Sequence, residues 1–198
     1  MSAAPIIIAS GGANLASLCF ALNRLGYEAP VTEDAASIRA ASHVILPGVG
    51  AARDAMQRLN NAGLATVIPD LRQPVLGICL GMQILFSGSE EDDAACLDII
   101  PGRAVRFTSS AELPVPQMGW NQLRPTGSSS LLEGVPDCAY AYFIHSYALP
   151  VDSYTRATTE YGAPFSSVVE QNNFFGTQFH PERSSVVGAQ ILANFLRL

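Results

Sequence analysis

Residues 74–86, PVLGICLGMQILF, set a cysteine between two glycines where an apolar strand pattern changes to a helical one. A strand that passes into a helix through Gly-x-nucleophile-x-Gly holds the middle residue on a tight, strained turn, and the glycines avoid collisions with adjoining backbone. Gly77, Cys79 and Gly81 fit this pattern, and the start of a helix favours a thiolate. Free cysteines are also common in cores, so the motif alone leaves Cys79 either a nucleophile or a buried apolar residue.

The segments before this elbow alternate between strand-like and helical patterns. We expect strands at 5–9, 43–47 and 74–78, and helices at 14–25, 52–60 and 80–86. Asn14 is expected to cap the first helix and Gly26 to end it. This order predicts an α/β fold of three layers, an open and mainly parallel sheet with helices on both faces.

From about Arg103 the chain changes to short alternating runs broken by proline and glycine. These runs predict antiparallel strands added to the same sheet, closed by an amphipathic helix over 185–198. The acidic stretch 87–94 and the stretch 126–130 are expected to be loops, the acidic one exposed.

Composition narrows the possible functions. The 198 residues are 48% hydrophobic, enough for one core, so we expect a single domain over 1–198. The net charge of −6 with no basic run argues against nucleic acid or an anionic membrane as partner. No apolar run approaches the roughly 18 residues of a membrane span and no signal pattern opens the chain, which predicts a cytoplasmic location. The four cysteines contain no CxxC pair, so neither a disulfide framework nor a metal site is expected.

A nucleophilic cysteine needs a base, and His180 in the sequence HPE is the best candidate of the three histidines. Glu182 lies two residues on, in what the pattern suggests is the end of a strand, so both side chains would point to one face. A carboxylate there holds the imidazole in one tautomer. On its own, such a His–Glu pair is more often an exposed surface pair without a catalytic role. His43 is expected to be structural.

The sequence LPGVG at 46–50 lies at the carboxyl end of a predicted strand, where open parallel sheets bind ligands. Gly48 and Gly50 allow bare backbone to approach a substrate, and the N–H of Val49 would stabilise an oxyanion together with that of Leu80. An ordinary strand-to-helix turn is the alternative.

Together these motifs, in this order along essentially the whole chain, resemble the class I (triad) glutamine amidotransferases. The resemblance implies a flavodoxin-like fold, no cofactor, and a Cys79–His180–Glu182 triad that hydrolyses L-glutamine through a glutamyl thioester. It also implies that Gln83 contacts the substrate and that Glu91 lies near the substrate amino group. Ser146 and Tyr147 would line the glutamine pocket.

Smaller features, PGVG, QMGWN at 117–121 and YFIHSYAL at 142–149, resemble the glutaminase subunits of imidazole glycerol phosphate synthase. That resemblance implies a heterodimer in which Trp120 and Asn121 meet a cyclase subunit, which uses the ammonia to form imidazole glycerol phosphate and 5-aminoimidazole-4-carboxamide ribonucleotide. It further implies weak glutaminase activity until the cyclase binds its ribonucleotide. We hypothesise that the Gly48–Val49 peptide flips at that point to complete the oxyanion site. His145 would orient Tyr147 or satisfy a buried polar network.

Other functions remain open at this stage. The glutaminase subunits of pyridoxal 5'-phosphate, anthranilate and aminodeoxychorismate synthases share the triad. A catalytically silent binding subunit would not need an intact triad, and a stand-alone γ-glutamyl hydrolase would be expected to carry a secretion signal. A core position for Trp120 is the alternative to a docking role.

Overall fold

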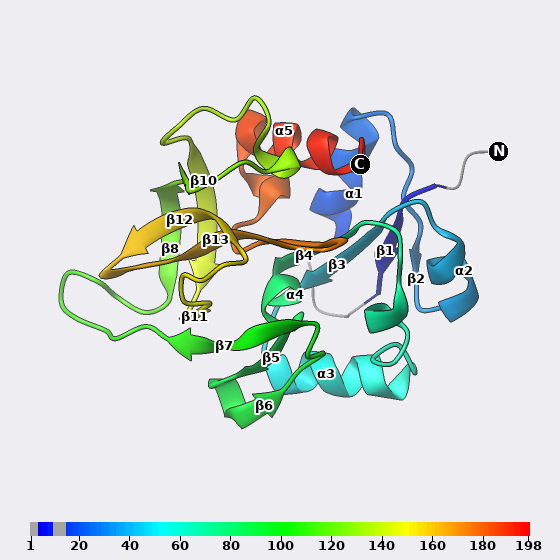
Figure 1. The fold of residues 1–198 in the computed structure, drawn as a ribbon, viewed down its shortest axis with the longest axis horizontal. Coiled ribbons are helices and arrows are strands. Elements are labelled where there is room, and N and C mark those ends of the chain that lie inside the picture. The colour runs from blue at the N-terminus through cyan, green and yellow to red at the C-terminus, as the bar shows by residue number, and fades with distance from the viewer. Residues whose placement is uncertain (1–3, 10–14) are drawn as a thin grey trace.

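The computed structural model describes residues 4–9 and 15–198, so the predicted cap at Asn14 lies outside the described residues. Within them, the main sheet has eight strands (Figure 1). Their spatial order is β2 (Val31–Thr32), β1 (Ile6–Ile8), β3 (Val44–Gly48), β4 (Val75–Cys79), β14 (Phe174–Thr177), β13 (Ala163–Gln171), β12 (Thr155–Tyr161) and β9 (Arg124–Pro125). The first five strands are parallel and the last three antiparallel.

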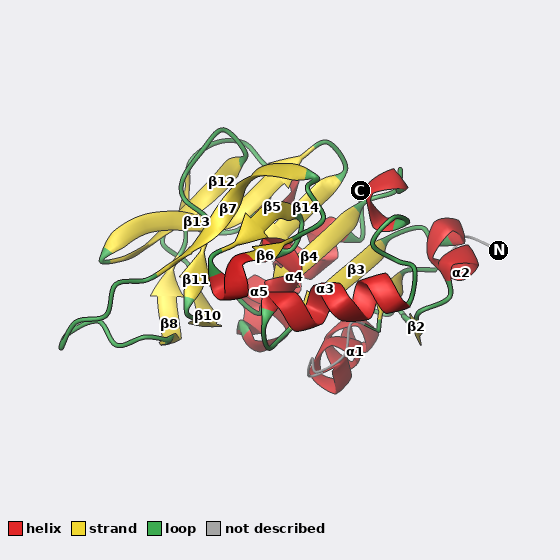
Figure 2. Ribbon diagram, turned by 90° about the horizontal axis from the view of Figure 1, so that it is seen from below, coloured by secondary structure: helices red, strands yellow, loops and turns green. Residues whose placement is uncertain are grey.

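Helices cover both faces of this sheet. Helices α1 (Leu15–Arg24) and α5 (Ser185–Phe195) lie on one face and α3 (Ala52–Asn61) on the other, as Figures 1 and 2 show. Alternate residues of the strands explain this: Ile7, Ile45 and Leu76 join one buried cluster, and Ile8, Leu46 and Val75 the other. The predicted three-layer α/β class is confirmed.

The prediction that the later part of the chain adds antiparallel strands to this sheet is confirmed for β9, β12 and β13 but not for the other antiparallel strands. Strands β8 (Gln117–Gln122) and β10 (Tyr140–His145) form a separate antiparallel pair, called the ribbon below. The other edge of β10 bonds to the turn after β14: His180 N donates to Tyr142 O over 3.0 Å, and Tyr142 N donates to Ser184 Oγ. Because this backbone is already paired with a turn, the ribbon cannot extend the sheet there. A further sheet contains β11 (Tyr147–Ala148), β7 (Ile100–Arg106), β5 (Phe86–Ser89) and β6 (Ala94–Ala95).

The helix predicted over 80–86 is shorter than expected. Helix α4 spans only Leu80–Gln83, and the chain enters β5 at Phe86. The carbonyls of Ile84, Leu85 and Phe86 accept bonds from the N–H groups of residues 97–100 instead of continuing the helix. The tertiary pairing overrides the helical pattern, and the helix dipole argument for Cys79 weakens because one turn carries little dipole.

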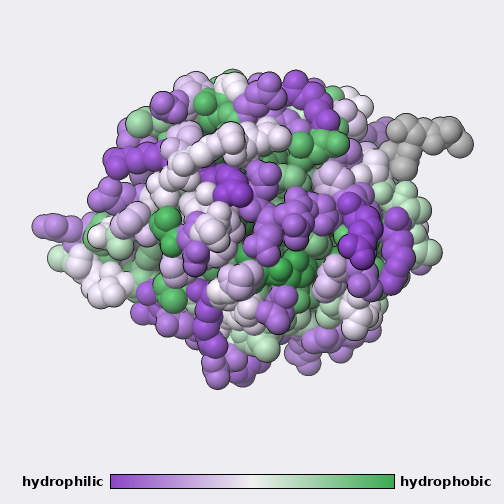
Figure 3. All heavy atoms as spheres, in the orientation of Figure 1, coloured by the Kyte–Doolittle hydropathy of each residue, from purple (hydrophilic) through white to green (hydrophobic). Residues whose placement is uncertain are grey.

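Several short elements were not predicted. Strand β2 has only two residues, and helix α2 (Ala35–Ala40) is capped by Asp34, whose carboxylate accepts from Ser37 N. Single 3-10 turns span Ile68–Asp70, Glu91–Asp93, Ser130–Leu132 and Pro181–Arg183. None of the helices in the described part of the chain is long and apolar enough to cross a membrane. On the face shown in Figure 3, hydrophobic residues form small patches among hydrophilic ones.

Candidate active site

The Gly-x-Cys-x-Gly stretch, residues 77–81, forms the predicted elbow between β4 and α4. Cys79 has φ 55° and ψ −112°, a conformation that L residues rarely adopt and that costs on the order of 1–3 kcal/mol. Side chains are excluded around it: a Cβ at Gly81 would lie 1.8 Å from the carbonyl oxygen of Leu46, and one at Gly77 would lie 2.6 Å from the carbonyl oxygen of Gly81. Backbone packing against β3 therefore holds the strained turn, as the sequence predicted.

Three groups approach the Cys79 sulfur. Its Sγ lies 3.7 Å from the carbonyl oxygen of Ile144 and 3.8 Å from Nε2 of Gln178. His180 is the third, because an interaction with the Cys79 side chain contributes to the raised pKa of this histidine. The sulfur belongs to a residue that is only 7% exposed, so these protein groups replace most of its solvent.

His180 and Glu182 are paired as predicted, although by a turn and not by a strand. β14 ends at Thr177, and Pro181–Arg183 form a 3-10 turn that folds the carboxylate back to 2.8 Å from His180 Nδ1. Burial opposes a charge on the imidazole, but hydrogen bonds and charge interactions with Cys79 and Glu182 outweigh it and raise the pKa of His180 to about 10. Because Nδ1 faces Glu182, Nε2 is the nitrogen left for the sulfur.

A buried chain of neutral hydrogen bonds extends from the sulfur to the far side of the site. Gln83 Nε2 donates both to Gln178 Oε1 over 2.9 Å and to the Tyr147 carbonyl over 2.8 Å. The Tyr147 carbonyl also lies 2.8 Å from Nδ1 of His145. Sequence reasoning missed Gln178, although its place in TQFHPE, two residues before His180, was a signal.

His145 is buried among aromatic rings, including Phe107 and Phe165, each with its ring centroid 5.2 Å away. Burial lowers the pKa of His145 to about 4, although its bond to Tyr147 acts in the opposite direction. The imidazole contacts the Tyr147 backbone through Nδ1, whereas its buried Nε2 has no hydrogen-bond partner among the described residues. His43 packs edge-on against Phe195 with ring centroids 5.3 Å apart, consistent with a structural role.

A cavity of about 280 Å³ opens at the sulfur. This volume lies near the lower end of the roughly 300–1,000 Å³ typical of ligand pockets. The lining brings together most of the residues singled out in the sequence: Val49, Gly50, Cys79, Leu80, Gln83, Glu91, Ser146, Tyr147 and His180, joined by Pro116, Ile144 and His145. A molecule the size of one amino acid fits such a space.

Gly48 is not among the residues that line this cavity. A Cβ at Gly48 would lie 2.6 Å from Gly81 N, so this glycine permits close packing of β3 on the elbow. Gly50 has φ +88° and open space around it, so the loop can turn there. A Gly48→Val test of the peptide flip would therefore disturb the elbow itself, and Gly50 is the better position for that test.

Glu91 comes from an acidic loop, residues 90–93, and lines the same cavity as Cys79. Its Oε2 accepts a 2.8 Å bond from Ala52 N at the start of α3. Burial raises the pKa of Glu91, partly offset by that bond. The prediction of an exposed loop over 87–94 is therefore wrong for residues 87–89, which belong to β5, and holds for Asp92 and Asp93 but not for Glu91, which is only partly exposed.

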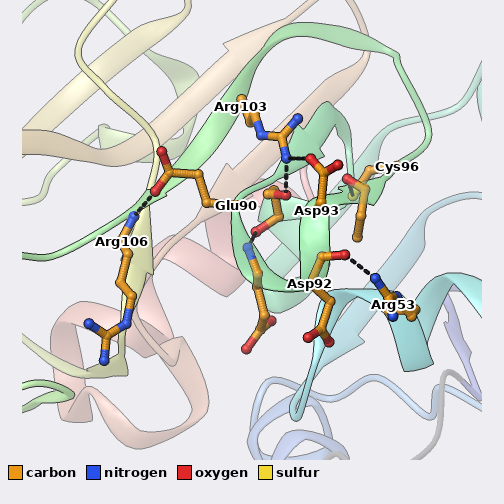
Figure 4. A network of polar contacts seen from close by, with 10 residues as sticks. Arg53, Glu90, Asp92, Asp93, Cys96, Arg103 and Arg106 are labelled. Atoms are coloured by element: carbon orange, nitrogen blue, oxygen red, sulfur yellow. Dashed lines mark hydrogen bonds and ion pairs between the residues drawn. The ribbon is translucent and has the colours of Figure 1, made fainter.

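Arginines hold the acidic loop from outside, as Figure 4 shows. Arg103 of β7 pairs with the Asp93 carboxylate and donates to the Ser89 carbonyl over 2.8 Å. Arg53 of α3 donates to the Asp92 carbonyl. Asp92 and Asp93 have φ 57° and 52°, so these contacts fix a backbone that side chains otherwise disfavour.

The ribbon carries the predicted partner residues. Trp120 is 54% exposed, which rules out the core alternative, and it packs edge-on against Tyr142. Arg183 lies over the other side of this aromatic group, 5.5 Å from the Tyr142 ring centroid. Asn121 is partly exposed, and its Nδ2 donates to the Glu160 carbonyl over 2.9 Å. Trp120 thus offers a contact surface and Asn121 supports the strand.

Comparison with known proteins agrees with this geometry. The glutamine amidotransferase class-I family matches residues 7–198, so the chain belongs to that family. Solved glutamine amidotransferase structures are similar in fold: one has a TM-score of 0.75 at 17% identity, covering 98% of this chain and 97% of its own. Another, from Thermotoga maritima, has a TM-score of 0.70 at 14% identity, covering 100% and 98%. At these identities the likeness shows the fold alone.

Closer relatives identify the group within this class. A protein from Xylella fastidiosa named imidazole glycerol phosphate synthase subunit HisH is 50% identical over 192 residues, covering 97% of this chain and 96% of the relative. A protein of the same name from Idiomarina loihiensis is 50% identical over 193 residues, covering 98% and 97%. The chain is therefore a member of the HisH family.

Proposed function

We propose that this chain is the glutaminase subunit of an imidazole glycerol phosphate synthase in histidine biosynthesis. It hydrolyses L-glutamine and passes ammonia to a cyclase subunit, HisF, in a cytoplasmic heterodimer. The single observation that carries this proposal is a strained, buried Cys79 that lines a cavity of about 280 Å³ together with His180, which is itself paired with Glu182. The 50% identity to HisH proteins supports the choice of synthase.

In the proposed reaction, Cys79 Sγ attacks the side-chain carboxamide carbon of glutamine. A sulfur–carbon bond forms, the carbon–nitrogen bond breaks, and His180 gives its proton to the departing nitrogen, which leaves as ammonia. The raised pKa of His180 keeps that proton in place near neutral pH. Water then attacks the thioester and returns a proton to His180, which releases glutamate and restores the sulfur.

The cavity walls suggest how the substrate is held. Glu91 is proposed to meet the glutamine ammonium group, while Gln83, Ser146 and Tyr147 line the same cavity. Leu80 and Val49 line the cavity on the sulfur side, where their N–H groups are proposed to stabilise the oxyanion. In this pose the reacting carboxamide would lie at Cys79 and the charged end at Glu91.

The ribbon is the proposed docking surface for the cyclase. Met118, Trp120 and Tyr140 are each more than half exposed on it, and exposed aromatic anchors of this kind often dominate protein interfaces. The same strand β10 supplies the Ile144 carbonyl that contacts the Cys79 sulfur. A partner seated on the ribbon would therefore lie close to the site that releases ammonia.

A reconstitution tests the proposal. The chain is mixed with HisF and the cyclase substrate N'-(5'-phosphoribulosyl)formimino-5-aminoimidazole-4-carboxamide ribonucleotide, and glutamate release is measured. We expect the loaded cyclase to stimulate the wild-type chain and Cys79→Ala to be inactive. Cys138→Ala, at an exposed cysteine, is the matched control and keeps full activity.

Two negative results of this reconstitution would disprove different parts of the proposal. Glutamate release by Cys79→Ala at the wild-type rate would disprove the proposed chemistry. A wild-type chain that hydrolyses glutamine but ignores the loaded HisF would leave the amidotransferase chemistry intact and disprove the proposed partner.

A further inference from the structure

Gln178 lies directly beside the elbow, although the triad does not include it. It follows β14, whose Thr177 pairs with Ile78 of β4, so the next residue on each strand brings Gln178 level with Cys79. Its side chain is fully buried, and its backbone N–H donates to the Ser167 carbonyl over 2.9 Å. A long polar side chain in such a place needs partners for both ends of its amide.

The orientation of that amide is determined by its neighbours. Gln83 Nε2 donates to the Tyr147 carbonyl, which identifies this end of the Gln83 side chain as the nitrogen. The same nitrogen also contacts the side chain of Gln178. The atom of Gln178 that meets this donor must be the acceptor, Oε1, at 2.9 Å. The donor end of Gln178, Nε2, therefore points to Cys79 Sγ at 3.8 Å.

This arrangement distinguishes between the two forms of the sulfur. A thiol can donate its hydrogen to the Ile144 carbonyl, 3.7 Å away, whereas a thiolate has no hydrogen to donate and is disfavoured by that oxygen. The amide N–H of Gln178 acts in the opposite sense, since a charged acceptor strengthens a hydrogen bond.

We propose that Gln178 is a further catalytic residue of this site: its amide N–H, aimed by Gln83, stabilises the Cys79 thiolate before attack and again when the thioester breaks. The inference deepens the proposed glutaminase function and rests on it for its biological meaning. The hydrogen bond itself does not depend on glutamine or on a partner.

The test measures the reactivity of Cys79 directly. Full-length protein is alkylated with iodoacetamide between pH 5 and pH 10, and modification of the Cys79 peptide is followed by mass spectrometry. Gln178→Met keeps the length of the side chain and removes the donor. Its alkylation midpoint is expected to move up by about one pH unit, which corresponds to about tenfold slower alkylation at a pH below both midpoints.

Further variants separate a hydrogen bond from general damage. Gln178→Glu presents a second negative charge to the sulfur and is expected to shift the midpoint further upward. Thr177→Val removes a neighbouring buried bond, from Thr177 Oγ1 to the Phe179 carbonyl, without touching the sulfur, and is expected to leave the midpoint unchanged. If Gln178→Met does not fold, Gln178→Asn, which keeps the amide but shortens its reach, is expected to shift the midpoint upward as well.

The outcomes are decisive in both directions. A folded Gln178→Met or Gln178→Asn protein with the wild-type alkylation profile overturns this inference. An upward shift in the Gln178 variants but not in Thr177→Val supports it, even if no glutamine hydrolysis is found with HisF. Failure of the proposed function therefore appears in the reconstitution, and failure of this inference appears in the alkylation profile.

Discussion

The two walls of the cavity are built in opposite ways. The elbow wall, residues 77–81, is held by backbone contacts that exclude any Cβ at Gly77 and Gly81 and by the buried amides of Gln83 and Gln178. The acidic wall, residues 90–93, is held by an arginine–aspartate pair whose side chains are 45% and 89% exposed. The wall that carries the sulfur is thus fixed by steric exclusion, and the wall that carries Glu91 by charges in contact with solvent.

The two walls therefore serve different purposes: one fixes the reacting sulfur, and the other is expected to bind the substrate. Steric contacts and buried neutral bonds do not respond to salt, whereas exposed ion pairs are screened by it and contribute about 0–1 kcal/mol each. Changes to the elbow wall should therefore affect folding or reactivity strongly. Changes to the acidic wall should affect substrate affinity, more weakly and in a salt-dependent way.

The largest expected effect comes from Gly81→Ala. The added methyl would lie 1.8 Å from the Leu46 carbonyl oxygen, so β3 and the elbow must separate. We expect a loss of about 3 kcal/mol or more in the free energy of unfolding, measured by urea denaturation. Gly127→Ala, where a Cβ would meet nothing within 4 Å, is the control and should change stability little. Equal stabilities would show that the elbow is not sterically fixed.

The next largest effect should be a loss of stability in acid, caused by His145 of β10. The pKa of His145 falls to about 4 in the folded protein, against about 6.5 in the unfolded chain. Between these values the unfolded state binds the extra proton, so stability decreases as pH falls from about 6.5 to 4, by up to about 3 kcal/mol. Unfolding curves of wild type and His145→Gln over this range test the prediction; the variant should lose less stability. Parallel pH profiles would contradict it.

Glu91→Gln should affect substrate binding at the acidic wall. The amide retains an oxygen that can accept from Ala52 N, while the charge proposed to meet the substrate ammonium is lost. We expect KM for glutamine to rise about tenfold with little change in kcat, in steady-state assays with the loaded cyclase. Asp92→Asn, a similar change on the exposed part of the same loop, should leave KM near wild type. A drop in kcat alone would assign Glu91 to the chemistry.

Arg103→Ala should have the smallest effect. It removes the pair with Asp93 and the bond to the Ser89 carbonyl, so we expect KM to rise about two- to fivefold at low salt. The difference in KM between this variant and wild type should shrink at about 0.5 M NaCl, where exposed ion pairs are screened. Arg106→Ala is the control, because Arg106 contacts Glu90 through its backbone N–H. A salt-independent effect would mean that Arg103 acts by packing.

The elbow could be predicted from sequence because its causes are local. Glycines flanking a cysteine between a strand pattern and a helix pattern describe the turn without further information. The length of α4 could not be predicted, since the N–H groups that end it come from residues 97–100. The same applies to the ribbon, whose separation from the sheet depends on bonds between Tyr142 and the distant turn at His180–Ser184.

The remaining site residues show the same limit. Glu91 and Tyr147 were found by resemblance to a family, and no local pattern indicated that an arginine on β7 would support the first. Gln178 was overlooked because its importance comes from Gln83, almost a hundred residues earlier, which orients its amide. Sequence motifs identify the reacting residues, while the residues that orient them are dispersed along the chain.

The bond between His180 N and the Tyr142 carbonyl has a consequence for hydrogen–deuterium exchange. The amide of His180 is protected by the ribbon and not by the parallel sheet that precedes it. Its exchange rate would therefore report how often the ribbon detaches from the turn, separately from unfolding of the core. A single backbone amide beside the imidazole thus offers a time-resolved measure of ribbon opening, and of its slowing when a partner is added.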